Sequence, residues 1–155
     1  LPTYPWAIFF GPSIDDVSRT YYVGAGNALY RCDLLTQDKE RVLGTGAEGF
    51  ADGDNGPQTA FGMDRLGGNG VAGKVAQTPD RSRLYFGDSY HRIRKIDLAA
   101  RPMTITTLAG KGVNSATSPP NPTWADGNAT EAIFFKVYSV SLDVDNDKLY
   151  VADNE

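Results

Sequence analysis

The sequence predicts an all-β fold assembled from repeated units of short antiparallel strands. Residues 84–98 read as two strands joined by a tight turn, with aromatic and branched residues that suit a pleated, largely buried surface. This hairpin pattern also occupies residues 21–34 and begins again at residues 149–155. The 155 residues include 17 glycines and 9 prolines, which supply many turn positions, and helical periodicity is poor throughout.

Several landmarks recur along the chain at nearly equal spacing. Tyr21, Leu84 and Leu149 begin the three hairpin segments. Ala-Ile-Phe-Phe occurs at residues 7–10 and again, two spacings later, at residues 132–135. Phe-Ala-Asp-Gly-Asp at residues 50–54 corresponds to Trp-Ala-Asp-Gly-Asn at residues 124–128, and both segments lie in long loops. Because independent landmarks agree on one period, we interpret the chain as an internal repeat.

Each unit is expected to contain four short strands followed by a long loop. In the second unit the strands are predicted at about 73–77, 83–87, 92–98 and 104–109. Ile93 and Ile96 are three residues apart, as are Leu29 and Cys32, which predicts a repeated β-bulge where the turn enters the third strand. The whole chain, 1–155, then forms one domain: repeat 1 at about 5–44, a loop at 45–70, repeat 2 at about 71–110, a loop at 111–136 and partial repeat 3 at about 137–155.

The repeat alignment also predicts packing. Tyr22, Tyr85 and Tyr150 should occupy equivalent positions in successive units. Leu84 and Leu149 should pack between sheets.

The segments TLAGKG, FADGD, AIFF and LYFGDSYHRIRKID resemble the NHL repeat, whose signature is Asn-His-Leu. His91 matches the signature histidine, whereas Tyr90 stands in place of its asparagine. That family builds β-propellers in which each repeat forms a four-stranded antiparallel blade around a central channel. The resemblance implies about two and a half NHL-like blades of an incomplete propeller, with six blades as the preferred total. The resemblance implies a fold but not a function, because NHL proteins include scaffolds, RNA binders, receptors and enzymes.

Composition restricts the functional classes. The net charge of −4 argues against bulk nucleic-acid binding, although Lys and Arg outnumber Asp in residues 62–101. The chain has no run of 18 apolar residues that could span a membrane. Cys32 is the single cysteine, which excludes an internal disulfide, and we expect it to be buried. The sequence predicts a soluble domain without naming a compartment; in a secreted protein Asn128 would be a glycosylation acceptor.

Candidate chemistry is sparse. His91 is the only histidine, so neither a His-clustered metal site nor a repeated Ser-His-Asp triad can form within the chain. Asp143, Asp145 and Asp147 alternate as in a calcium loop, but Lys148 stands where such a loop needs glycine. For these residues we favour a tight polar turn, and for the acidic loops at 52–56 and 126–128 we favour loop closure over metal binding. We therefore predict no catalytic residues, metal or cofactor.

The sequence favours a non-enzymatic interaction module that presents propeller loops to a protein or another ligand. The alternative is a propeller enzyme, a lyase or hydrolase with a metal-dependent site in the central channel. Two and a half blades cannot close a ring, since propellers have about four to eight. We therefore expect the chain to associate with the remaining blades of a propeller, supplied by the same chain, a second fragment or another copy. The candidate ligand contacts are Asp88, Tyr90, His91, Arg92, Arg94, Lys95 and Asp153, with Arg83 as a further contact for an anionic partner.

Overall fold

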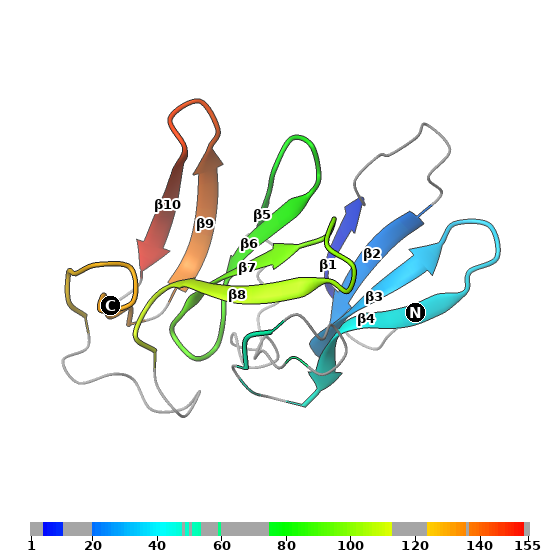
Figure 1. The fold of residues 1–155 in the computed structure, drawn as a ribbon, viewed down its shortest axis with the longest axis horizontal. Coiled ribbons are helices and arrows are strands. Elements are labelled where there is room, and N and C mark those ends of the chain that lie inside the picture. Colours follow the sequence, from blue (N-terminus) through cyan, green and yellow to red (C-terminus); the bar gives the residue numbers. More distant parts are fainter. Residues whose placement is uncertain are drawn as a thin grey trace.

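The structure, a computed structural model, describes residues 5–10 (backbone only), 20–47, 49, 51–53, 59, 75–112, 124–135 and 137–153. Within these residues, ten strands form three antiparallel sheets that lie side by side in chain order (Figure 1). Sheet 1 contains β1 (Pro5–Phe10), β2 (Thr20–Ala25), β3 (Asn27–Asp33) and β4 (Lys39–Gly46). Sheet 2 contains β5 (Val75–Gln77), β6 (Arg83–Gly87), β7 (Ile93–Asp97) and β8 (Thr104–Ala109), and sheet 3 contains β9 (Val137–Asp143) and β10 (Lys148–Asp153).

The all-β prediction is confirmed. Each strand of sheets 1 and 2 pairs with its neighbour in sequence, so both sheets are simple meanders. The predicted bounds of β6 and β8 are those observed, whereas β7 is one residue shorter than predicted at each end. The predicted start of the first strand of sheet 2, at residues 73–74, lies outside the described residues. Among the described residues, no helix is long and apolar enough to cross a membrane.

The predicted bulge is present in both complete sheets, but its extra residue lies on the neighbouring strand. The β7–β8 register shifts between Ile93 and Arg94, and the β3–β4 register shifts between Leu29 and Tyr30. In sheet 2, Leu108 of β8 is the residue without a direct partner on β7. The spacing of Ile93 and Ile96 therefore has a different cause: sheet 2 is buried on both faces, and the two side chains belong to different apolar clusters.

These two clusters hold the three sheets together. One cluster combines residues of sheets 1 and 2, including Tyr22 and Leu43 from sheet 1 with Leu84 and Phe86 from β6. The other lies between sheets 2 and 3 and includes Tyr85 of β6 beside residues of β9 and β10. Because side chains alternate along a strand, β6 sends its even-numbered residues toward sheet 1 and Tyr85 toward sheet 3.

The predicted equivalence of three tyrosines is confirmed for strand position but not for burial. Tyr22, Tyr85 and Tyr150 lie on β2, β6 and β10, the second strand of each sheet. Tyr22 is buried and Tyr85 is half-buried, whereas 59% of Tyr150 is exposed. Leu84 is fully buried, as predicted, and Leu149 is half-buried against the cluster between sheets 2 and 3.

Sheet 3 approaches sheet 2 closely at Gly87. A Cβ atom at this position would lie 2.3 Å from Cγ1 of Val137, which is closer than two carbon atoms can pack. The absence of a side chain at Gly87 therefore sets the spacing between β6 and β9.

Candidate functional site

The turn between β6 and β7 is organised by Asp88. The backbone amides of Tyr90 and Arg92 donate to Oδ1 of Asp88 at 2.9 and 3.0 Å. The amide of Asp88 donates to the carbonyl oxygen of Arg92 at 2.9 Å, which closes the turn. His91 lies at the tip with a φ of 62°, a left-handed conformation in which short polar residues occur most readily.

Arg94 forms a buried ion network with two aspartates. Its Nη1 donates to Oδ2 of Asp88 at 2.9 Å, and its Nη2 donates to Oδ1 of Asp52 at 2.6 Å. The side chains of Arg94 and Asp88 are fully buried, whereas that of Asp52 is 45% exposed. The guanidinium thus joins the β6–β7 hairpin to the loop that precedes sheet 2.

The same loop is fastened to β8. Oδ2 of Asp52 accepts a hydrogen bond from the amide of Thr107 at 2.9 Å, and Oδ1 accepts one from the Thr107 hydroxyl at 3.0 Å. The next residue, Gly53, forms an antiparallel bridge with Ile105. Asp52 therefore contacts both β7 and β8, which confirms the loop-closure interpretation of this residue.

Burial dominates the electrostatics of the hairpin. It raises the pKa of the Asp88 carboxyl, and the Arg94 guanidinium opposes that shift most strongly. Burial also lowers the pKa of Arg92, whose guanidinium is next to the equally charged Arg94. Among the described residues, three buried side-chain atoms lack a hydrogen-bond partner: Oγ of Ser89, Nδ1 of His91 and Nε of Arg94.

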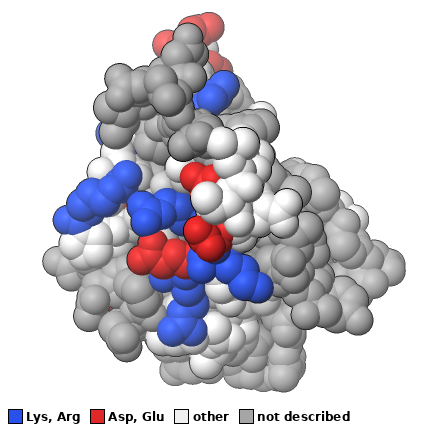
Figure 2. Space-filling view, turned by 90° about the vertical axis from the view of Figure 1, so that its right-hand side faces the viewer, with Lys and Arg blue, Asp and Glu red and all other residues white. Residues whose placement is uncertain are grey.

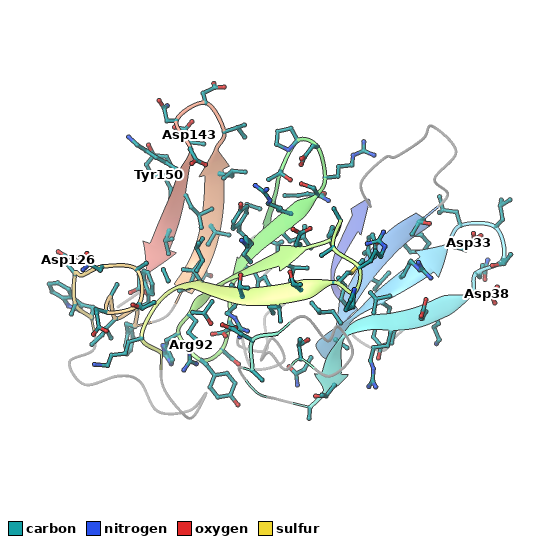
Figure 3. All side chains as sticks on the ribbon, viewed as in Figure 1. Asp33, Asp38, Arg92, Asp126, Asp143 and Tyr150 are labelled. Carbon is teal, nitrogen blue, oxygen red and sulfur yellow. The ribbon has the colours of Figure 1, made fainter. Side chains whose placement is uncertain are left out.

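Arg92 lies along the surface of the fold rather than projecting from it. Its guanidinium lies 6.0 Å from the centre of the Tyr90 ring, and a Cβ at Gly112 would collide with its Cζ. Only 8% of Arg92 is exposed. Figure 3 shows Arg92 beyond the end of β8, at the lower edge of sheet 2.

The structure brings most of the predicted ligand contacts together, although several are buried. Four of them are buried: Asp88, Tyr90, Arg92 and Arg94. The positions of Arg92 and Arg94 therefore do not favour charged contact with a partner. His91 and Lys95 are half-buried, and Asp153 lies apart on β10, where its Oδ2 accepts a hydrogen bond from the amide of Phe135. Sequence reasoning missed the contact between Asp52 and Arg94; the recurrence of Ala-Asp-Gly at 51–53 and 125–127 was its only sequence signal.

The predicted polar turn at 143–147 is confirmed. Oδ1 and Oδ2 of Asp143 accept hydrogen bonds from the amide and side chain of Asn146. No group of three or more metal-ligating side chains occurs among the residues that the structure describes. Asn128 lies in an exposed turn of the 124–135 loop, so its side chain is open to solvent.

The far end of sheet 1 carries charges of both signs. Arg31, Lys39, Glu40 and Arg41 are exposed there, and Arg31 forms an ion pair with Glu40. Figure 2 views this side of the molecule and shows Lys and Arg side chains interspersed with Asp and Glu. Such a mixed surface offers no extended field of one sign to a polyanion.

The turn before β6 provides a pH-dependent contact. Oδ1 of Asp80 accepts hydrogen bonds from the Thr78 hydroxyl and from the amide of Ser82. These bonds, the one from Thr78 most of all, lower the pKa of Asp80 from 3.8 to about 2. We expect the stabilising contribution of this carboxylate to be complete above pH 3.8 and to be lost as the pH falls through about 2.

An NMR titration of the Asp80 carboxyl carbon should give this lowered pKa. Thr78→Val should raise the value toward 3.8, because the variant lacks the main donor. Thr36→Val, in the exposed β3–β4 turn, is the control and should leave it unchanged. An Asp80 pKa near 3.8 in the unaltered chain would contradict the hydrogen-bonding geometry.

Comparison with known proteins shows a similar fold and no family. No protein-family model and no curated protein matches the chain. The solved structures include an auxiliary nutrient binding protein from Bacteroides thetaiotaomicron that is similar to this chain, with a TM-score of 0.61 and 22% sequence identity. The match covers 94% of this chain and 34% of the other, so the chain spans about a third of that protein's length.

Proposed function

We propose that the chain forms part of an NHL-like β-propeller and acts as a non-enzymatic module that binds a small nutrient molecule. Successive antiparallel sheets with apolar clusters between them are compatible with propeller blades. The observation that carries the binding role is the structural similarity to an auxiliary nutrient binding protein.

The non-enzymatic part of the proposal rests on how the buried charges are used. Asp88 and Arg94 bond to each other, and the exposed side of the network is closed by Asp52. A general acid or base needs a carboxyl group that can reach a substrate proton, and a fully buried, ion-paired Asp88 does not provide one.

The β6–β7 turn is the proposed contact region. Oγ of Ser89 and Nδ1 of His91 are buried polar atoms without a protein partner among the described residues, so a ligand that opens the turn would satisfy them. Polar atoms of this kind confer specificity, because an unpaired buried group is costly until a ligand bonds to it.

The test is a calorimetric titration of the chain with a panel of oligosaccharides, amino acids and nucleosides, followed by mass spectrometry of each mixture. We expect reversible binding of one class, without turnover and without a response to EDTA. His91→Asn, which tolerates the left-handed backbone, should weaken binding about tenfold, or about 1.4 kcal/mol. Asp38→Asn, in the β3–β4 turn, is the control and should bind normally.

Turnover of a ligand would be an equally informative outcome. Conversion of a ligand into product, abolished by EDTA, would replace the binding module with the alternative of a metal-dependent propeller lyase or hydrolase. Unchanged affinity in His91→Asn would move the ligand away from the β6–β7 turn.

A further inference from the structure

The loops that precede sheets 2 and 3 each accept a backbone hydrogen bond from the end of the preceding sheet. The amide of Thr45 donates to the carbonyl oxygen of Thr59, and the amide of Lys111 donates to that of Ala132, both at 2.8 Å. Thr45 lies between Gly44 and Gly46, and Lys111 lies between Gly110 and Gly112. All four glycines have a positive φ. Each loop is therefore tied to the end of the preceding sheet by an equivalent hydrogen bond.

This equivalence places two aspartates of the third unit in the roles of Asp52 and Asp88. Asp126 occupies the central position of its Ala-Asp-Gly segment, as Asp52 does in the earlier loop. Asp153 ends β10, in the segment LYVAD, as Asp88 follows β6 in the segment LYFGD. In the second unit the corresponding pair of carboxylates holds one guanidinium.

In the third unit the corresponding pair lines a pocket, where Oδ2 of Asp153 already accepts the hydrogen bond from the amide of Phe135. Asp126 and Asp153 lie on its wall together with Trp124 and Phe134, and the volume is about 480 Å³. Figure 1 shows the 124–135 loop beside the carboxyl end of β10, and Figure 3 places Asp126 in that loop. Among the described residues, no ion pair with Asp126 is formed.

The edge of β10 is the second part of the site. β6 pairs with β5 on one side and with β7 on the other, and Arg94 enters the network from β7. β10 pairs with β9, and within the described residues its other edge has no strand. Such an edge is a template for strand addition.

We propose that this pocket receives an arginine from a β-strand that pairs with the edge of β10 opposite β9. The added strand takes the place that β7 has in sheet 2, and its arginine takes the place of Arg94. A guanidinium fits because its planar fork can donate to two carboxylates at once, which the single ammonium of a lysine does less well. The proposal rests on the repeat architecture in the proposed function, but not on the nutrient ligand.

The chain itself provides the probe. A capped synthetic peptide with the sequence of residues 89–98 contains the whole of β7 and its arginine. It is titrated into the 155-residue chain, and binding is followed by NMR through the indole of Trp124, which lines the pocket. We expect saturable binding, reduced at least tenfold when the peptide carries Arg94→Gln and clearly reduced with Arg94→Lys.

Variants of the chain test the carboxylates. Asp126→Asn should weaken peptide binding about tenfold and should leave folding intact, because Asp126 is exposed. Asp38→Asn, an exposed aspartate of sheet 1, should have no effect. Reduced binding in Asp126→Asn together with discrimination between the arginine and glutamine peptides establishes the pocket as the arginine site.

Other results overturn the proposal. These are no binding, equal binding of the arginine and glutamine peptides, or equal binding by Asp126→Asn. Self-association of the chain that excludes the peptide and persists in Asp126→Asn would assign the β10 edge to a second copy. Peptide binding without nutrient binding would contradict the proposed function alone, whereas nutrient binding without peptide binding would contradict only the arginine site.

Discussion

Replacing Arg94 with methionine is expected to lower the free energy of unfolding by about 3–5 kcal/mol. Methionine fills much of the same space but leaves the Asp88 carboxylate buried and without its guanidinium. It also weakens the attachment of the 51–53 loop, which then keeps the hydrogen bonds of Asp52 to Thr107 and the bridge between Gly53 and Ile105. Urea unfolding followed by circular dichroism measures the loss.

The cost of Arg94→Met should depend on pH. Burial already raises the pKa of Asp88, and the variant removes the guanidinium that opposes this shift. A raised folded-state pKa gives stability that is present at low pH and lost as the pH rises through that pKa. The stability deficit of the variant should therefore shrink on acidification, when Asp88 is protonated and uncharged.

Arg31→Met is the matched control for this experiment. Arg31 also forms an ion pair, with Glu40, but their side chains are 47% and 62% exposed. Exposed pairs of this kind contribute about 0–1 kcal/mol. A loss at Arg94 no larger than the loss at Arg31 would mean that the buried network does not hold the loop to sheet 2.

Truncating Leu84 to alanine should cost about 2–5 kcal/mol. Leu84 is fully buried in the cluster between sheets 1 and 2, so the change leaves a cavity whose walls are two separate sheets. The midpoint of urea unfolding should fall accordingly.

Leu35→Ala provides the comparison for Leu84→Ala. Leu35 lies in the β3–β4 turn and is 66% exposed, so the same truncation should change stability by no more than about 0.5 kcal/mol. Similar losses at the two positions would contradict the packing of sheet 1 on sheet 2.

The local elements of this fold can be predicted because their signals are local. Turn residues and apolar runs predict the first and last residues of β6 and β8 correctly. The polar turn after Asp143 follows from the strand that begins at Lys148. The bulge position could be predicted too, but not which strand carries its extra residue. Leu108 is exposed enough to look like an ordinary strand residue, and its place depends on pairing with β7.

The ion network could be predicted only in part. Asp88 and Arg94 are six residues apart on one hairpin, so their proximity follows from the turn. Asp52 is 42 residues from Arg94, and its contact depends on where residues 51–53 lie against sheet 2. Sequence reasoning treated Arg94 as a surface contact because charge alone does not reveal which arginine is paired inside the protein.

The opposite orientations of Ile93 and Ile96 affect how the protein unfolds. Ile93 belongs to the cluster shared with sheet 3, whereas Ile96 belongs to the cluster shared with sheet 1. Loss of β7 would thus uncover apolar surface on both sides at once, so neither interface can open through this strand without weakening the other. In a linear array whose stability is a sum of neighbour interactions, such a shared strand provides cooperativity. The described parts of sheets 1, 2 and 3 should therefore melt in a single transition.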